Sequence, residues 1–311
     1  MDIDAMAIRS VDREMVRRLS RRSDRRGLLQ LAGDVGLLCA TGLLVWATRG
    51  SLWLALAVML HGVTLNFLFC PLHESVHRTA FASRWVNDWV ARLCGALLIL
   101  PPEYFRLFHL AHHRFTQDPA QDPELIQARP VSVASYVWRV SGLPNWYSRL
   151  TVTLRHALTG RVPEPYVSVS KRALIVREAR VLWGCYLAVI GISCFFSRVD
   201  ALIYWILPAI AGQPMIRLLL LAEHTACEFS DDMFANTRTT YTNGLVRFLT
   251  WQMSYHAEHH AFPSVPFHAP AEVNARSQDR LAVTARGYLA LHRGLIRKLR
   301  MPHTVSDEGA T

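Results

Sequence analysis

Long apolar runs joined by very short polar segments dominate the first quarter of the chain. Residues 28–48 form an apolar run of 21 residues interrupted by Asp34, and residues 52–72 form a second run of 21. As an α-helix, each run would extend about 30 Å, which is the thickness of the hydrocarbon core of a bilayer. Because only Arg49-Gly50-Ser51 joins the two runs, the pattern predicts a transmembrane helical hairpin.

A second pair of apolar runs occupies residues 181–197 and 201–222, with Arg198-Val199-Asp200 between them. The later run contains two prolines, so we expect it to be kinked. It also contains Arg217, whose guanidinium is expected to reach toward the membrane interface. This pair predicts a second transmembrane hairpin.

The region between the two hairpins lacks a run long enough to cross a bilayer. Within residues 86–102 only eight consecutive residues are apolar and uncharged, which predicts an interfacial helix. Residues 125–180 mix Trp, Tyr, Arg and Pro and predict amphipathic pieces on the membrane face. The expected fold is an all-α integral membrane protein with four transmembrane helices, arranged as two hairpins, and a cytosolic helical cap.

The domain organisation that follows is a single catalytic domain with six successive regions. They are a basic cytosolic N-terminal helix (1–27), hairpin 1 (28–72), a cytosolic and interfacial region (73–180), hairpin 2 (181–222), a cytosolic cap (223–303) and a disordered tail (304–311). The basic start lacks a short apolar core and cleavage site, so we interpret it as a leader to the first span and not as a signal peptide.

Charge supports this topology. Charged residues make up only 19% of the chain, and the net charge is +10. Residues 1–27, 73–180 and 223–311 hold 31 of the 34 basic residues, which places both termini on the cytosolic side by the positive-inside rule. A basic chain can bind nucleic acid, but no nucleic-acid-binding motif is found, so a membrane surface is the expected partner.

Histidines form three clusters of one pattern. Eight of the fourteen histidines lie in His73-Glu74-Ser75-Val76-His77, His109-Leu110-Ala111-His112-His113 and His256-Ala257-Glu258-His259-His260, and His224 stands outside them. Positions i, i+3 and i+4 share one face of a helix, so the histidines of the third cluster are expected to point to one spot. A lone histidine is usually a core or capping residue, but this repetition predicts a multi-histidine metal site.

The number of imidazoles suggests the number of metal ions. One structural zinc has four ligands, so nine imidazoles favour two metal ions, and imidazole suits iron, copper or zinc alike. The six cysteines include no C-x-x-C pair, which argues against a disulfide or iron-sulfur framework. Cys227 lies three residues after His224, and this zinc-like spacing is a weaker alternative.

The order and separation of the three clusters, over about residues 50–270, resemble the histidine boxes of the membrane fatty acid desaturase superfamily. The run Asn236–Thr240 and the segment His260–Pro266 resemble its bacterial fatty acid desaturase branch. The resemblance implies a non-haem di-iron centre, and carried over residue by residue its ligands would be His73, His77, His109, His112, His113, His256, His259 and His260, with His224 as the additional histidine.

Four neighbouring positions qualify this assignment. Acyl-CoA desaturases have an Asn one turn before the additional histidine, whereas this chain has Leu220, and Glu223 could compensate. Glu74 and Glu258 either hydrogen-bond ligand N–H groups or are solvated helix residues. Outside these positions, we assign Asp118, Asp122 and Glu124 to turns because Asp-Pro favours turns. His61 either lines the substrate path or bonds two helices together.

The resemblance implies an O2-dependent oxidoreductase, most often one that desaturates a fatty acyl or lipid chain in a bacterial inner membrane. A hydroxylase or ketolase acting on a lipid, carotenoid or small amphiphile is the alternative. A metal transporter or sensor is a remote alternative, because the only acid within a predicted span is Asp34. The chain has no dinucleotide or haem-attachment motif, so no tightly bound organic cofactor is expected. Electrons would come from a separate donor such as a ferredoxin, a rubredoxin or a cytochrome.

Overall fold

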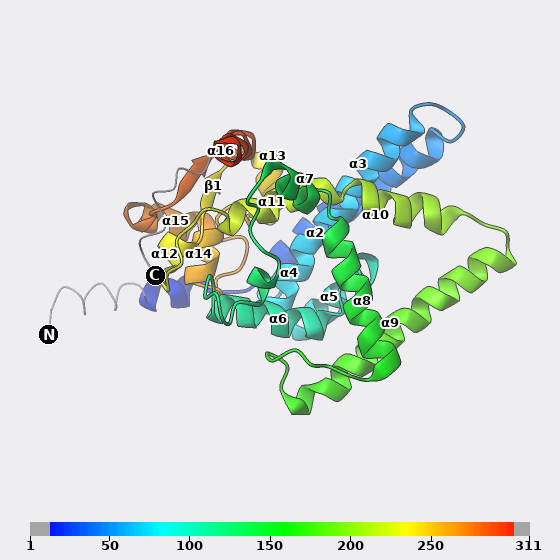
Figure 1. Ribbon diagram of the computed structural model, residues 1–311, viewed down its shortest axis with the longest axis horizontal. Coiled ribbons are helices and arrows are strands. Elements are labelled where there is room, and N and C mark those ends of the chain that lie inside the picture. The colour runs from blue at the N-terminus through cyan, green and yellow to red at the C-terminus, as the bar shows by residue number, and fades with distance from the viewer. Residues whose placement is uncertain (1–12, 302–311) are drawn as a thin grey trace, which may run out of the picture.

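The computed structural model describes residues 13–301, and these are mostly helical (Figure 1). The first two-thirds of the described chain contains the helices α2 (Asp24–Ala47), α3 (Leu54–Phe67), α4 (Phe69–His77), α5 (Arg84–Leu98), α6 (Pro102–Arg114), η1 (Pro123–Ile126), α7 (Val133–Val140), α8 (Leu143–Thr159) and α9 (Val169–Phe195). The remainder contains η2 (Leu202–Ile206), α10 (Leu207–Ala211), α11 (Gln213–His224), α12 (Met233–Asn236), β1 (Thr239–Tyr241), α13 (Gly244–Leu249), α14 (His256–Ala261), α15 (Pro270–Ser277), η3 (Gln278–Arg280), β2 (Thr284–Arg286) and α16 (Tyr288–Arg300).

Three helical segments of the described chain are long and apolar enough to cross a membrane. They are Asp24–Ala47, Leu54–His77 and Leu202–His224, which correspond to the predicted runs 28–48, 52–72 and 201–222. The segment Leu54–His77 joins α3 to α4, and Leu202–His224 joins η2, α10 and α11. Two of the three therefore continue into helical turns that carry predicted site histidines.

The fourth predicted span, residues 181–197, lies in the second half of α9 and is not among these three segments. The first half of α9 carries five charged residues between Lys171 and Arg180, which leaves 15 uncharged residues to the end of the helix. Such a stretch covers about 22 Å, less than the hydrocarbon core. The described structure thus supports a helical membrane protein, with three spans identified by length and composition.

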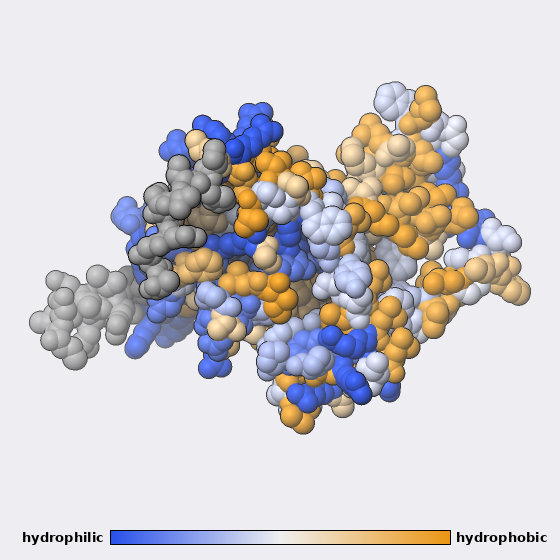
Figure 2. Space-filling model, in the orientation of Figure 1, coloured by the Kyte–Doolittle hydropathy of each residue, from blue (hydrophilic) through white to orange (hydrophobic). Residues whose placement is uncertain are grey.

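Apolar side chains cover the projecting hairpin formed by α2 and α3 and the arm formed by α9 and α10 (Figures 1 and 2). At the tip of the first hairpin Trp46 is 65% exposed and Leu52 is 98% exposed, and at the end of α9 Phe195 is 82% exposed. Apolar surface on this scale is typical of contact with lipid.

The N-terminal region differs from its predicted form. Residues 13–19 are helical, the helix stops before Ser23, and α2 then starts at Asp24. The Ser23 side chain accepts a hydrogen bond from the Arg26 amide (3.3 Å) and so caps α2. The predicted basic helix of 1–27 is therefore divided in two where it is described. Residues 1–12, and the predicted tail 304–311, lie outside the described residues.

The C-terminal cap contains a small sheet that the all-α expectation does not include. Strands β1 and β2 pair in parallel, with Thr239 opposite Thr284 and Tyr241 opposite Arg286. Strand β1 follows a threonine-rich tract, and β-branched residues favour the extended backbone. Strand β1 precedes α14 and β2 follows it, so the sheet joins the two segments that flank the third histidine cluster.

Close helix packing joins the first hairpin to the segment η2–α10–α11. A Cβ atom at Gly212 would lie 2.0 Å from the Gly62 carbonyl, so the two backbones touch. Asn66 donates from Nδ2 to the Ala209 carbonyl (3.0 Å), and His61 bonds to Thr41 through Nδ1 (2.9 Å) and to the Tyr204 carbonyl through Nε2 (3.0 Å). His61 therefore ties helices together, which is typical of small and polar residues at membrane helix contacts.

Replacement of Gly212 tests this contact. We expect Gly212→Ala to lower the free energy of unfolding by about 1–3 kcal/mol, because the new methyl group overpacks a backbone contact. Gly36→Ala in α2 is the matched control, since a Cβ there meets nothing within 4 Å, and it should be neutral or slightly stabilising. Thermal unfolding of both variants in detergent measures the difference. Equal melting temperatures for the two variants would contradict the contact.

Candidate metal centre

Four helices bring the nine predicted histidines together. Helix α4 carries His73 and His77, α6 carries His109, His112 and His113, α11 ends at His224, and α14 carries His256, His259 and His260. In Figure 1 α4, α6 and α11 lie between the projecting α2–α3 hairpin and α14, which lies beside α12 and α15. Side chains from distant segments, including Phe69, Phe105 and Trp251, form one buried core around them.

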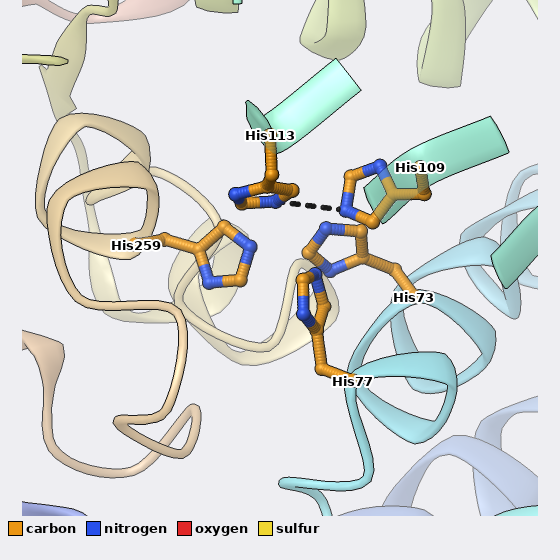
Figure 3. Close-up of side chains that lie close together, drawn as sticks. All are labelled: His73, His77, His109, His113 and His259. Atoms are coloured by element: carbon orange, nitrogen blue, oxygen red, sulfur yellow. Dashed lines mark hydrogen bonds between the residues drawn. The ribbon is translucent and has the colours of Figure 1, made fainter. Parts of the chain in front are cut away.

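Five histidines form the first group, which we call the five-histidine cluster. Figure 3 shows the imidazoles converging, and their ligand nitrogens lie within 4.8 Å of one another: His73, His77, His109, His113 and His259. Several of the nitrogens are buried and have no hydrogen-bond partner, namely both nitrogens of His73, Nδ1 of His113, and Nε2 of His77 and of His259. A buried polar atom without a partner is costly unless something outside the protein chain satisfies it.

The other four histidines form a second cluster together with Glu223. His112, His224 and His260 have ligand nitrogens within 4.8 Å of one another, and so do the ligand atoms of Glu223, His224 and His256. The two clusters are adjacent, because the rings of His113 and His260 stack with their centroids 4.0 Å apart.

Neighbouring positions on one helix serve different clusters, which differs from the prediction for residues 256–260. His259 faces the five-histidine cluster, whereas His256 and His260 face the second cluster. On α6 the pair His109 and His113 faces the first and His112 faces the second. The reason is geometric: residues i and i+4 are nearly aligned along a helix, whereas i+3 lies on the other side of that line. Helices α6 and α14 therefore lie between the two groups.

Polar groups behind the second cluster hold three of its imidazoles. Nδ1 of His112 lies 2.9 Å from Asp122 Oδ1, Nδ1 of His224 lies 3.3 Å from the Asn236 carbonyl, and Nδ1 of His260 lies 3.1 Å from Thr116 Oγ1. A carboxylate and a carbonyl only accept hydrogen bonds, so His112 and His224 donate from Nδ1. In the neutral form of each, Nε2 then carries a lone pair that points into the cluster.

Asp122 is the main site residue that the sequence analysis missed. It was assigned to a turn, and it does accept from the Gln117 amide (2.8 Å) and the Glu124 amide (2.9 Å). The same carboxylate also orients His112. Ten residues separate Asp122 from His112, and nothing in that spacing distinguishes an orienting acid from a turn acid.

The three predicted acids have different surroundings. Glu74 Oε1 lies 4.0 Å from Nδ1 of both His73 and His259, and Glu223 Oε2 lies 3.4 Å from His256 Nε2. Glu258 instead accepts from Thr239 (2.5 Å) and Asn274 (2.5 Å). Glu74 and Glu223 thus face the histidines, whereas Glu258 anchors α14 to β1 and α15.

Burial keeps most imidazoles of the site neutral. Together with the neighbouring imidazoles, it holds the pKa of His109, His113, His256 and His260 well below the usual range, and it lowers the pKa of His259 to about 3. His112 differs: burial opposes its protonation, but Glu124 and Asp122 outweigh burial and raise its pKa. These two acids therefore favour the protonated form of His112.

The separations between facing nitrogens fit a metal centre. The Nε2 atoms are 3.0 Å apart in His109 and His113, 3.1 Å in His256 and His260, and 3.2 Å in His112 and His224. Two ligands bound at about 2.1 Å and at right angles on one ion would lie about 3.0 Å apart. Where both facing nitrogens carry lone pairs they repel each other, so a cation between them satisfies both.

A cavity of about 440 Å³ opens beside the second cluster, and His112 and His224 form part of its wall. Apolar side chains of α4, α6 and α11 line one side, among them Phe69, Phe105 and Leu220. A cavity of this size and lining is typical of a site for a small molecule or for part of a lipid. It gives a substrate direct access to the histidines.

Cys227 and the remaining described histidines of the C-terminal half and α8 take part in packing or hydrogen bonds away from the two clusters. Cys227 is buried and is not part of any metal-ligating group found among residues 13–301. His156 Nε2 lies 3.1 Å from Glu164, His268 bonds to Arg26 (2.9 Å), and His292 bonds to Tyr136 (2.9 Å). His303 lies outside the described residues.

Comparison with known sequences settles the family. Residues 45–290 match the sequence model of the fatty acid desaturase family, and this range includes all nine histidines of the two clusters. The chain belongs to the fatty acid desaturase family. The desaturase assignment made from the three histidine boxes is thereby confirmed at the level of the family.

Relatives of this desaturase act on lipids, as their names state. It is 26% identical to a sphingolipid delta(4)-desaturase DES1-like protein of Oryza sativa subsp. japonica over 255 residues, which cover 78% of this chain and 70% of the rice protein. It is 28% identical to an sn-1 oleoyl-lipid 12-desaturase of Picosynechococcus over 137 residues, or 42% of this chain and 38% of that relative. Identity to the Rattus norvegicus sphingolipid delta(4)-desaturase/C4-monooxygenase DES2 is 24% over 245 residues, or 75% and 69%.

The buried imidazoles predict how the stability of the metal-free desaturase depends on pH. Below about pH 6.5 the unfolded chain binds protons at histidines that stay neutral in the folded protein, so the free energy of unfolding should fall as pH decreases. The raised pKa of His112 has the opposite effect on stability, but the lowered pKa values of the five other histidines outweigh it. The melting temperature of metal-free protein should therefore be lower at pH 5.5 than at pH 7.5. An unchanged or higher value would contradict neutral burial.

Proposed function

We propose that this protein is a membrane-bound, O2-dependent desaturase of a fatty acyl or lipid chain with a di-iron centre. The observation that carries the proposal is the pair of adjacent clusters in which buried imidazoles converge, with five nitrogens of the five-histidine cluster left without a hydrogen-bond partner. Membership of the fatty acid desaturase family supports iron as the metal and a lipid chain as the substrate.

The ligands of the two iron ions follow from the two clusters. One ion would be held by the five-histidine cluster, and the other by His112, His224, His256 and His260. Glu223 would complete the second set, since its Oε2 atom lies 3.4 Å from His256 Nε2 and its Oε1 atom is buried without a partner. Glu223 would thereby replace the Asn of acyl-CoA desaturases, whose position is taken by Leu220 in this chain, since leucine has no atom that could serve a metal.

The bound iron pair would supply oxygen activation and removal of hydrogen from an unactivated C–H bond. Residues of the chain prepare the site for this. Asp122 and the Asn236 carbonyl fix the tautomers of His112 and His224, so that Nε2 is free to ligate. The apolar wall with Phe69 and Phe105 excludes water from the cavity and orients the substrate chain beside these histidines.

The membrane topology and partners belong to the same proposal. The three identified spans would cross a bacterial inner membrane, and the apolar half of α9, although shorter than the hydrocarbon core, would enter it to complete the second hairpin. Both termini and the histidine clusters would lie on the cytosolic side. A separate ferredoxin, rubredoxin or cytochrome would deliver the electrons there. The substrate would enter from the lipid phase, against which the exposed apolar hairpins lie.

Hydroxylation is a second candidate activity. One relative is named both a desaturase and a C4-monooxygenase, and both outcomes begin with removal of hydrogen from carbon. The mass of the product separates them, because desaturation removes two hydrogens whereas hydroxylation adds one oxygen.

Iron content and product formation in a host of defined lipid composition test the proposal together. The purified protein should contain two irons per chain, and its lipids should include a species lighter by two hydrogens. His77→Ala should lower iron content toward one per chain by opening the five-histidine cluster, and should abolish the product. His156→Ala is the matched control outside both clusters and should retain both irons. Full iron content in His77→Ala, or an iron-free wild type, would overturn the assignment.

Asp122→Asn tests the orienting role of the carboxylate. The amide no longer favours the Nδ1–H tautomer of His112, so we expect affinity for the second metal to fall about 10–100-fold. Titration of the metal-free protein with Fe²⁺ measures this. Asp118→Asn, on the exposed side of the same turn, should leave both affinities unchanged. Equal loss in the two variants would indicate a general effect on the turn.

A further inference from the structure

The cavity beside the second cluster carries more positive charge than its own acids neutralise. Five arginines line it: Arg129, Arg139, Arg149, Arg155 and Arg217. Three acids line it too, and each has another partner. Asp122 bonds His112, Glu164 pairs with Arg155, and Glu124 lies 3.8 Å from His112 Nε2.

Three of these arginines have no carboxylate partner. No ion pair within 4.0 Å joins Arg139, Arg149 or Arg217 to an acid anywhere in residues 13–301. Arg149 donates to the Leu98 carbonyl (2.7 Å), which leaves its charge uncompensated. Nε of Arg217 is buried without any hydrogen-bond partner. Glu124 and Glu223 favour the charge of Arg217 from a distance, but no oxyanion pairs with the guanidinium directly, and a buried guanidinium is stabilised when one does.

Arg217 shares a helix face with the metal-facing histidine. Residues 220, 221 and 224 lie three, four and seven positions after Arg217 on α11, which is the spacing of one helix face, and all four residues line the cavity. Arg217 was expected to reach toward the membrane interface; in the structure its side chain lines this cavity and its Nε atom is buried. Seven residues separate it from His224, which is about 10 Å along the helix axis.

We propose that Arg217 and Arg149 bind the anionic end group, a carboxylate or a phosphate, of an amphiphilic substrate inside this cavity. This inference rests on the proposed function, because it concerns the substrate of the same site. Arg139 adds positive charge at the same end. A guanidinium pairs with either oxyanion through two parallel hydrogen bonds. The apolar wall near Phe69 and Phe105 then receives the substrate chain.

The position of Arg217 sets where along the substrate the reaction takes place. An end group fixed about 10 Å from His224 along α11 keeps the reacting carbon at a constant distance from the anionic end. The position of the new double bond should therefore be counted from that end and should not change when the chain is lengthened at its methyl end.

Binding to the metal-free protein tests the anion site without any need for iron. The full chain in a neutral detergent is titrated with decanoate, decyl phosphate and decan-1-ol, and the melting temperature is recorded. At least one of the two anions should raise the melting temperature, and the uncharged alcohol should not. The anion that stabilises more identifies the end group. No stabilisation by either anion, or equal stabilisation by the alcohol, would overturn the proposal.

Variants locate the effect. Arg217→Gln should weaken binding of the stabilising anion about tenfold or more, as expected for a lost charge-assisted pair, whereas Arg217→Lys should retain part of it. The exposed Arg297→Gln on α16 is the matched control and should bind as the wild type does. Without ligand, Arg217→Gln should melt no lower than the wild type, because it removes an uncompensated charge.

Two outcomes would refute the role of Arg217: unchanged anion binding in Arg217→Gln, or equal weakening in Arg297→Gln. If Arg217→Gln does not fold, Arg149→Gln and Arg217→Lys take its place, and unchanged anion binding in both would refute the site. Product analysis with two acyl chains of different length is a second test. A double bond at a constant distance from the methyl end would contradict binding of the anionic end group by Arg217. An iron-free wild-type protein would refute the proposed function, but the anion titration would still test the binding site, because it uses metal-free protein.

Discussion

The structure depends on one electrostatic constraint, which is that nine imidazoles are packed together with many of their nitrogens facing one another. Five nitrogens of the five-histidine cluster have no hydrogen-bond partner, and three pairs of Nε2 atoms in the two clusters face each other at 3.0–3.2 Å. Neutral imidazoles so arranged repel through their lone pairs, and protonated ones would repel through their charge. A pair of metal ions would relieve both conflicts at a site that the polar groups of the chain do not complete.

The surrounding fold supplies the rigidity that this arrangement needs. Backbone contact between Gly62 and Gly212 brings the hairpin that ends in α4 against the segment that ends in α11. Arg106 donates to the Val76 carbonyl (2.6 Å) and joins α6 to the end of α4, while Glu258 joins α14 to the sheet. Each helix that carries a histidine is therefore fixed by contacts made away from the site, as a preorganised metal centre requires.

The sequence predicts what depends on local periodicity. Run length and hydropathy located three spans to within a few residues, and the histidine spacing picked out eight of the nine histidines that lie in the two clusters, all except His224. The division of α6 and α14 between two clusters depends on how helices dock, so the pattern around His259 could not reveal it. The role of Asp122 depends on its contact with His112, 10 residues earlier. The strand at Thr239 depends on pairing with Thr284, more than 40 residues later. Tertiary contacts override local propensity in such cases.

The balance of charge connects the metal centre to the cavity. Two divalent ions would bring four positive charges to the clusters, and four carboxylates stand close enough to offset them: Glu74, Asp122, Glu124 and Glu223. Glu124 and Glu223 favour the charge of Arg217 from a distance, but neither forms an ion pair with it within 4.0 Å. Arg217 and Arg149 therefore lack a directly paired oxyanion in a buried cavity wall, where a counter-ion would stabilise their charge. A substrate that brings its own anion would complete the neutralisation that the chain leaves unfinished.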